Sequence, residues 1–197
     1  MTDTLEYIDQ QLFLFLNGLH TPILDTIMWY VSTIKLWIPL FIIILIYAFN
    51  KGKWQLALIV TLGVALNILL ADRISVELFK EVFQRYRPTH NLDIRHLVHT
   101  VQKPNGNTYL GGQFGFVSSH AANFFAITTF LVFMFRRFSK LWYLLFLWAA
   151  LIAYSRIYLG VHYPSDVLVG GLLGMLIGTV VYYISKSIIT KYGHLKT

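Results

Sequence analysis

The segment SRIYLGVHYPSDVLVGGLLGMLIGTVVYYIS, residues 155–185, joins a short polar turn to an uncharged apolar run. The run, Val167–Ser185, approaches the length that crosses a bilayer as a helix, because about 20 helical residues span the hydrocarbon core. The turn places Arg156, His162 and Asp166 at the membrane boundary, and Asp166 is the only Asp or Glu in the second half of the chain. Because charges next to a membrane are costly to bury, the turn is a candidate functional site.

The composition predicts a membrane protein of one domain. Of the 197 residues, 56% are hydrophobic and 13% are charged, and the mean hydropathy is +0.60. Soluble proteins are more polar than this. The formal net charge is +7, but most cations flank apolar runs, which is typical of contacts with lipid headgroups and disfavours nucleic acid as a partner. The chain has no cysteine, so disulfides and thiolate metal sites are excluded.

Apolar stretches predict an all-α integral membrane bundle of about five to six transmembrane helices. Four stretches without charge are Trp54–Ala71, Ala121–Phe135, Leu141–Ser155 and Val167–Ser185. An earlier span contains Leu36–Phe49, and we expect it to extend back through Trp29 and Tyr30 with Lys35 inside it. The bundle then occupies residues 21–190.

Residues 1–20 are expected to form an amphipathic helix that lies in the membrane interface. Its apolar residues recur at helical spacing and oppose a polar face. The apolar set is Leu5, Ile8, Leu12, Phe15 and Leu16, and the polar set is Glu6, Asp9 and Gln10. The acidic start does not resemble a cleaved signal peptide, which has a basic N-terminal region.

Cations between the spans predict the topology. Three clusters fall on the same side of a five-span chain: Lys51 and Lys53; Arg136, Arg137 and Lys140; and Lys186, Lys191 and Lys196. That side is expected to be cytoplasmic, with residues 191–197 as a cytoplasmic tail. The opposite side holds the loop of residues 89–117 and the turn before the last span. Cations in and before this loop, such as Arg85 and Arg95, depart from the rule that Lys and Arg are concentrated on the cytoplasmic side. An anionic substrate would explain their presence on the opposite side.

Three segments on that opposite side can together perform phosphoryl transfer. Lys80 and Arg87 recur at helical spacing, two turns apart on one face. Ser118, Ser119 and His120 open the third of the five spans, where serines cap a helix and free N–H groups bind anions. The polar turn adds the third segment.

The roles follow from the residue types. Lys80, Arg87 and Arg156 can neutralise phosphate oxygens. His162 can attack phosphorus through an unprotonated nitrogen, while Asp166 accepts the other ring N–H. His120 can then protonate the leaving alkoxide and later activate water. This scheme requires no metal and no cofactor.

Each segment also has a simpler interpretation. Lys80 and Arg87 can be interfacial anchors, and the serines can be no more than a helix cap. His162 and Asp166 can form a structural hydrogen bond, or can ligate a metal together with His120, although three nearby cations would repel a metal ion. The placement of all three segments on one side of one topology favours a site.

The three segments resemble the signature of the type 2 phosphatidic acid phosphatase (PAP2) superfamily, K-x6-RP, PSGH and SR-x5-H-x3-D. Its first part matches Lys80, Arg87 and Pro88, and its third part matches Ser155, Arg156, His162 and Asp166. In the middle part, VSSH replaces PSGH, so Val117 and Ser119 stand where the family has Pro and Gly. The resemblance covers roughly Trp54–Ile184.

The resemblance implies a membrane phosphatase with a helical bundle core and a phosphohistidine on His162. The implied phosphate-binding residues are Lys80, Arg87, Ser118, Ser119 and Arg156. His120 is the implied acid and base, and Asp166 orients His162. No metal and no cofactor are implied.

Bacterial members of this family act on lipid phosphates at the periplasmic face, namely undecaprenyl diphosphate, phosphatidylglycerol phosphate, phosphatidic acid or lipid A. We therefore expect a multi-pass protein of the bacterial inner membrane whose site faces the periplasm or exterior, with lipids as its partners. The phrases YSRIYLGVHYPSD and GFVSSHAANFF are similar to small enzymes of Bacteroidetes, some of which dephosphorylate lipid A. Two alternatives remain: a phosphotransferase that passes the phosphoryl group to a lipid alcohol, and a non-catalytic lipid or anion carrier.

Overall fold

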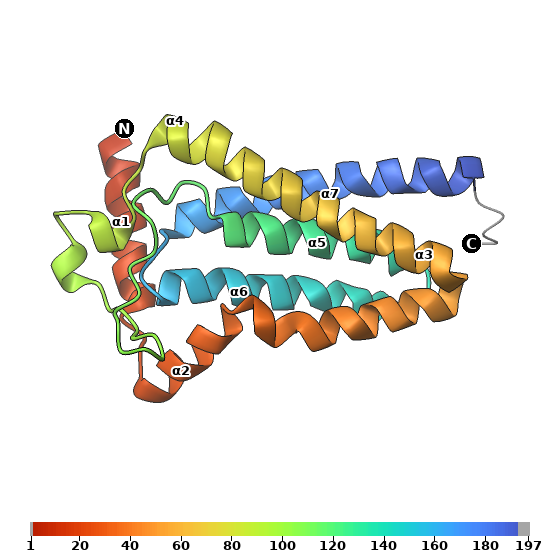
Figure 1. The fold of residues 1–197 in the computed structure, drawn as a ribbon. Coiled ribbons are helices and arrows are strands. Elements are labelled where there is room, and N and C mark those ends of the chain that lie inside the picture. The colour runs from red at the N-terminus through yellow and green to blue at the C-terminus, as the bar shows by residue number, and fades with distance from the viewer. Residues whose placement is uncertain (1, 193–197) are drawn as a thin grey trace.

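The structure, a computed structural model, describes residues 2–192, and within that range it is built from helices joined by loops. The long helices are α3 (Ile38–Ile74), α5 (Ser119–Phe135), α6 (Leu145–Tyr158) and α7 (Pro164–Tyr192). They run side by side as a bundle (Figure 1). Short 3₁₀ helices precede α3 (Ile34–Trp37) and α6 (Lys140–Leu144). The all-helical fold that the sequence predicts is confirmed.

Helix α3 crosses the bundle twice. Gly52 and Lys53 leave the helical conformation, and Lys53 has a φ of 56°. The chain reverses there, so that the two halves of α3 form a hairpin (Figure 1). Together with α5, α6 and α7, the hairpin accounts for the five predicted spans.

The predicted start of the first span is wrong. Trp29 and Tyr30 belong to a separate short helix, α2 (Pro22–Val31), which Thr21 caps through a hydrogen bond from Leu24 N. Thr33 is extended, and Pro39 lies in the first turn of α3. Because proline favours the first turn of a helix, it marks a new start that a hydropathy pattern does not show.

The second half of α3 continues well beyond Ala71. A π-helical segment, Ser75–Lys80, and the single turn α4 (Glu81–Phe83) extend it. Gln84 then adopts a left-handed conformation with a φ of 48°, which ends the helix. Arg87 therefore lies in an extended segment, and the prediction that Lys80 and Arg87 share one helix face is wrong.

Helix α1 (Thr2–Asn17) lies across the end of the bundle where α6 ends and α7 begins (Figure 1). Leu5, Ile8, Leu12 and Phe15 are exposed, with 46–65% of each side chain accessible. Phe13 and the amide of Asn17 are buried, and Leu16 is partly buried against the cluster that contains Phe13. The predicted N-terminal helix is therefore present but ends at Asn17, and most of its predicted apolar stripe is exposed.

Helices α5 and α7 pack closely, and this packing brings their N-termini together at one end of the bundle. A Cβ atom on Gly174 would lie 2.2 Å from the carbonyl oxygen of Ala122, and one on Gly178 would lie 2.3 Å from that of Ala126. Small residues at such positions let two helix backbones approach closely in a membrane.

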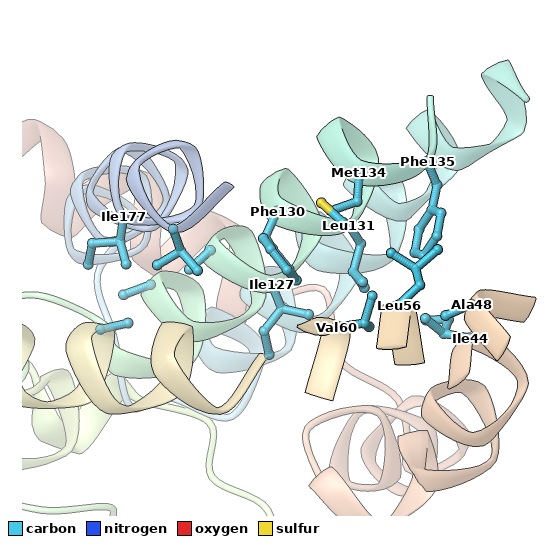
Figure 2. Close-up of a cluster of buried hydrophobic side chains, with 14 residues drawn as sticks. Ile44, Ala48, Leu56, Val60, Ile127, Phe130, Leu131, Met134, Phe135 and Ile177 are labelled. Carbon is cyan, nitrogen blue, oxygen red and sulfur yellow. The ribbon is translucent and has the colours of Figure 1, made fainter. Parts of the chain in front are cut away.

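The larger core cluster joins both halves of α3 to α5 and α7. Figure 2 shows its side chains, which include Val60, Ile127, Phe130 and Ile177. At one end of this core the N-termini of α5 and α7 lie together, and Ser118 N donates a hydrogen bond to the carbonyl oxygen of Asp166 over 3.0 Å.

The two ends of the bundle differ in what they carry. The loop of residues 84–118, the turn before α7 and helix α1 lie at one end (Figure 1). The hairpin at Gly52, the connection after α5 and the end of α7 lie at the other, so the predicted cation clusters share one end. Lys196 and the predicted tail from residue 193 lie outside the described residues.

Candidate active site

Lys80 reaches the start of α5 from the end of the extended α3 helix. Its Nζ donates to Ser119 Oγ over 2.6 Å, and Ser119 Oγ shares a second hydrogen bond of 2.7 Å with Ser75 Oγ. Ser75 is fully buried. The π-helical segment thus places a serine and a lysine against one hydroxyl.

Ser118 and Ser119 form the start of α5. Ser118 is the N-cap and accepts a hydrogen bond from Ala121 N through its Oγ. Ser118 is fully buried and Ser119 is 9% exposed. The predicted helix cap is present, and it leaves the first N–H groups of α5 beside the Lys80 ammonium, an arrangement that suits an anion.

Arg87 is held by backbone atoms of the loop and of the turn before α7. Its Nε donates to Phe114 O over 3.1 Å, and its Nη1 donates to Val161 O over 3.3 Å. A Cβ atom on Gly111, whose φ is +69°, would lie 2.9 Å from Arg87 Nη1. The glycine therefore leaves the room that the guanidinium occupies.

Arg156 lies in the last turn of α6 and is 3% exposed. It donates to Ser32 Oγ through Nη1 and to the hydroxyl of Tyr109 through Nη2 over 2.7 Å. Neither Ser32 nor Tyr109 stands near Arg156 in the sequence, and spacing alone gives no signal for either contact.

His162 presents its two ring nitrogens to different neighbours. Nε2 lies 3.2 Å from Arg87 Nη1, and Nδ1 lies 3.4 Å from Asp166 Oδ2. Because a guanidinium only donates, the first contact requires an unprotonated Nε2 and leaves the proton on Nδ1. The Nδ1 atom makes no hydrogen bond of good geometry in this conformation, so Asp166 is adjacent to the ring but not yet bonded to it.

His120, the second residue of α5, completes the set. Its ring lies within electrostatic range of Arg156, His162, Arg87 and Lys80. The structure therefore brings all eight residues predicted from the sequence to one end of the bundle. These are Lys80, Arg87, Ser118, Ser119, His120, Arg156, His162 and Asp166.

The three cations of the site have neutral hydrogen-bond partners. Lys80 bonds to a hydroxyl, Arg87 to two carbonyl groups and an imidazole, and Arg156 to two hydroxyls. Asp166 directs one oxygen at Arg85, outside this set. Three converging cations without a bonded carboxylate form a strong site for an anion.

Burial and like charges perturb the groups outside the spans. Burial and the charge of Arg156 lower the pKa of Arg87 to about 10. Burial, together with Arg87 and Arg156, holds the pKa of His162 well below its ordinary value. The shift of His162 favours the neutral imidazole that a nucleophile requires, and a pKa of about 10 still leaves Arg87 charged at neutral pH.

Several residues of the site had no signal in the sequence. Gly115 leaves room beside His162 and Asp166, since a Cβ atom on Gly115 would lie 3.0 Å from Asp166 Oδ2. Arg85 bonds to Asp166 over 2.8 Å, although the sequence marks it only as one of several cations in its loop. Residues 2–192 contain no group of three His, Asp or Glu side chains arranged to hold a metal, so the alternative of a metal on His120, His162 and Asp166 finds no support in this geometry.

Comparison with known proteins identifies a family and several relatives of this chain. The model of the PAP2 superfamily matches residues 52–189. A lipid A 4'-phosphatase of Bacteroides thetaiotaomicron is 37% identical over 191 residues, which cover 95% of this chain and 81% of that protein. A lipid A 4'-phosphatase of Porphyromonas gingivalis is 36% identical over 183 residues, covering 90% and 74%.

Solved structures share the fold. The PAP2-type phosphatidylglycerolphosphate phosphatase of Bacillus subtilis superposes with a TM-score of 0.64 at 24% identity, over 98% of this chain and 90% of that one. LpxE of Aquifex aeolicus superposes with a TM-score of 0.61 at 25% identity, over 88% and 94%. A family match over most of the length, with relatives above one-third identity, shows that this chain is a phosphoric ester hydrolase and belongs to the PAP2 superfamily.

Proposed function

We propose that the protein is a membrane lipid phosphatase that hydrolyses its substrate through a phosphohistidine on His162. The observation that carries the proposal is the position of His162 Nε2, which lies 3.2 Å from Arg87 Nη1 within a group of cations that bond to neutral partners. A phosphate placed among these cations lies in reach of that nitrogen.

In the first step, Nε2 attacks phosphorus and the bond from phosphorus to the lipid oxygen breaks. His120 donates its proton to the leaving alkoxide, while Asp166 stabilises the positive imidazolium. In the second step, His120 takes a proton from water, the hydroxide attacks phosphorus and the P–N bond breaks. Inorganic phosphate leaves, and both histidines return to their starting states. Lys80, Arg87, Arg156 and the start of α5 stabilise the charge on the phosphoryl oxygens in both steps.

A lipid substrate is supported by an apolar groove close to the polar turn. A cavity of about 300 Å³ between α5, α6 and α7 is lined by apolar groups, among them Ala153, Ile157, Pro164 and Val167. Its lining includes Pro164 and Val167, which flank Ser165 and Asp166 at the start of α7. Its composition suits a hydrocarbon chain.

Among lipid phosphates, the 4'-phosphate of lipid A is the substrate that the relatives favour. Two lipid A 4'-phosphatases align over at least 90% of this chain. An undecaprenyl-diphosphatase of Sulfolobus acidocaldarius is 28% identical over 70% of the chain. We place the site at the outer face of the inner membrane, because the opposite end carries the cation clusters that mark a cytoplasmic side.

The test is release of inorganic phosphate by the purified protein in mixed detergent micelles. The substrates are lipid A bisphosphate, phosphatidylglycerol phosphate, phosphatidic acid and undecaprenyl diphosphate, each with mass spectrometry of the lipid product. We expect phosphate release from lipid A and a product that lacks the 4'-phosphate. Release from none of the four lipids would contradict the proposal.

A variant pair and an acceptor lipid complete this test. His162→Ala should abolish phosphate release, whereas His96→Ala, a change at an exposed histidine of the loop, should not. A lipid alcohol in the micelles distinguishes a phosphotransferase, since that activity would move the phosphoryl group to the alcohol in place of water.

A further inference from the structure

We propose that Arg85 is a positioning residue, which holds Asp166 beside His162 and ties this pair to helix α1. The inference rests on the proposed function, because Asp166 acts there by supporting His162. Arg85 lies between Lys80 and Arg87 in the sequence, but its side chain takes no part in the cation group that faces the substrate.

The hydrogen bonds of Arg85 go to three carboxylates and one hydroxyl. Its Nη1 donates to Asp166 Oδ1 and to Ser165 Oγ, over 2.8 and 2.7 Å. Its Nη2 donates to Glu6 Oε2 and Asp9 Oδ2, each over 2.8 Å. One guanidinium thus joins two acids of α1 to the acid of the site, and only a planar fork with several donors can do this.

The two oxygens of Asp166 have separate partners. Oδ1 accepts from Arg85, while Oδ2 accepts from Tyr163 N over 2.9 Å and faces His162 Nδ1. Asp166 is fully buried, and a buried carboxylate is stable only with hydrogen bonds and a charge partner. Arg85 is the cation bonded to it, and it fixes the carboxylate plane that Oδ2 presents to the imidazole.

Arg85 is itself firmly held. Its guanidinium carbon lies 4.0 Å from the centre of the Tyr163 ring. Burial acts to lower the pKa of Arg85, but the carboxylates of Asp166, Asp9 and Glu6 outweigh burial and raise that pKa. The side chain therefore stays charged under all ordinary conditions.

Helix α1 holds the other side of this network. Asp9 Oδ1 accepts from Ser165 N over 2.9 Å, and Asp9 Oδ2 accepts from Ser165 Oγ. The polar face of α1 therefore lies against the first turn of α7, one residue before Asp166. Phe15 on the opposite face is exposed, and the bonds of Asp9 to Arg85 and Ser165 couple the placement of α1 to that of Asp166.

The experiment measures kcat and KM for phosphate release from lipid A bisphosphate and from phosphatidic acid in the same micelles. Arg85→Gln should lower kcat by about ten- to a hundredfold, the usual loss when a group that orients a site residue is removed. KM should change by less than about twofold, because Arg85 does not touch the phosphate-binding side chains and uniform binding is retained. Arg85→Lys keeps the charge beside Asp166 but has fewer donors, so its kcat should lie between those of Arg85→Gln and the unchanged protein.

Arg73→Gln is the matched control. Arg73 also bonds to a glutamate, Glu77, over 2.8 Å, but that pair is exposed. The control loses the same charge and a similar contact, and its kcat should equal that of the unchanged protein.

A double-variant cycle separates positioning from a general effect on the fold. In the Asp166→Asn background, Arg85→Gln should add no further loss, because Arg85 acts through Asp166. An unchanged kcat in Arg85→Gln, an equal added loss in the Asp166→Asn background, or a rise in KM alone would each overturn the inference. If Arg85→Gln does not fold, the same criteria apply to Arg85→Lys.

His162→Ala distinguishes the two proposals. If this variant keeps its turnover, the proposed function fails and the role of Asp166 fails with it. If it is inactive while Arg85→Gln keeps full kcat, only the inference about Arg85 fails.

Discussion

At the residue scale, the site uses neutral partners to hold positive charge. Arg156 is the clearest case, because its bonds go to Ser32 and to the hydroxyl of Tyr109. Tyr109 belongs to the loop of residues 84–118. Its hydrogen bond to Arg156, a proposed phosphate-binding residue, places it at the candidate site.

Tyr109→Phe should therefore weaken substrate binding. A hydrogen bond to a charged group contributes about 1.5–3 kcal/mol, so KM should rise by about tenfold or more in micellar assays. Tyr143→Phe removes a hydroxyl from an exposed tyrosine at the other end of the bundle and should leave KM unchanged. An unchanged KM in Tyr109→Phe would show that Arg156 does not depend on this hydroxyl.

His162 should make stability depend on pH. Its pKa in the folded protein is far below the ordinary value, so near pH 6 the unfolded chain binds a proton that the folded chain does not. The contribution of His162 to the free energy of unfolding is therefore fully present above about pH 6.5. It is lost as the pH decreases, by up to about 1.4 kcal/mol per pH unit. His162→Gln removes this dependence, so the variant should lose less apparent Tm between pH 7 and pH 5 than the unchanged protein. Equal losses in both proteins would contradict the low pKa.

At the element scale, the α5–α7 contact holds the two halves of the site together. Gly174→Leu would place a side chain at a position where even a Cβ atom would lie 2.2 Å from Ala122 O. Overpacking costs about 1–3 kcal/mol, so the apparent Tm should fall and phosphate release should fall with it. Gly112→Ala is the control, since nothing lies within 4 Å of a Cβ there. An unchanged Tm in Gly174→Leu would mean that the helices are not in close contact.

The elements also show what the sequence could predict. Ser118 as the N-cap of α5 follows from the local rules of helix capping and is as predicted. The left-handed Gln84 and the separate α2 were missed, because tertiary contacts decide where those helices end. Arg85 was missed for a related reason: its partners Glu6 and Asp9 are far away in sequence, and no spacing within the motif indicates them.

At the scale of the whole molecule, the segments of the site lie at one end of the bundle, and the hairpin of α3, the connection after α5 and the end of α7 lie at the other (Figure 1). Because the chain has no cysteine, single cysteines report on topology without background. Asn105 is exposed in the loop at the site end, and Lys51 is exposed at the hairpin of α3. Each is replaced by cysteine in a separate variant, Asn105→Cys and Lys51→Cys. In intact cells whose outer membrane is permeable, an impermeant maleimide should label Asn105→Cys only. Labelling of Lys51→Cys alone would reverse the proposed orientation.

The central claim is that His162 carries the phosphoryl group, and trapping the intermediate tests it most directly. His120→Ala lacks the base for the second step, and p-nitrophenyl phosphate has a leaving group that needs no acid for the first. After an alkaline quench, which preserves phosphohistidine, mass spectrometry of this variant should find phosphate on His162. The absence of any phosphoenzyme, or phosphate on a different residue, would contradict the account.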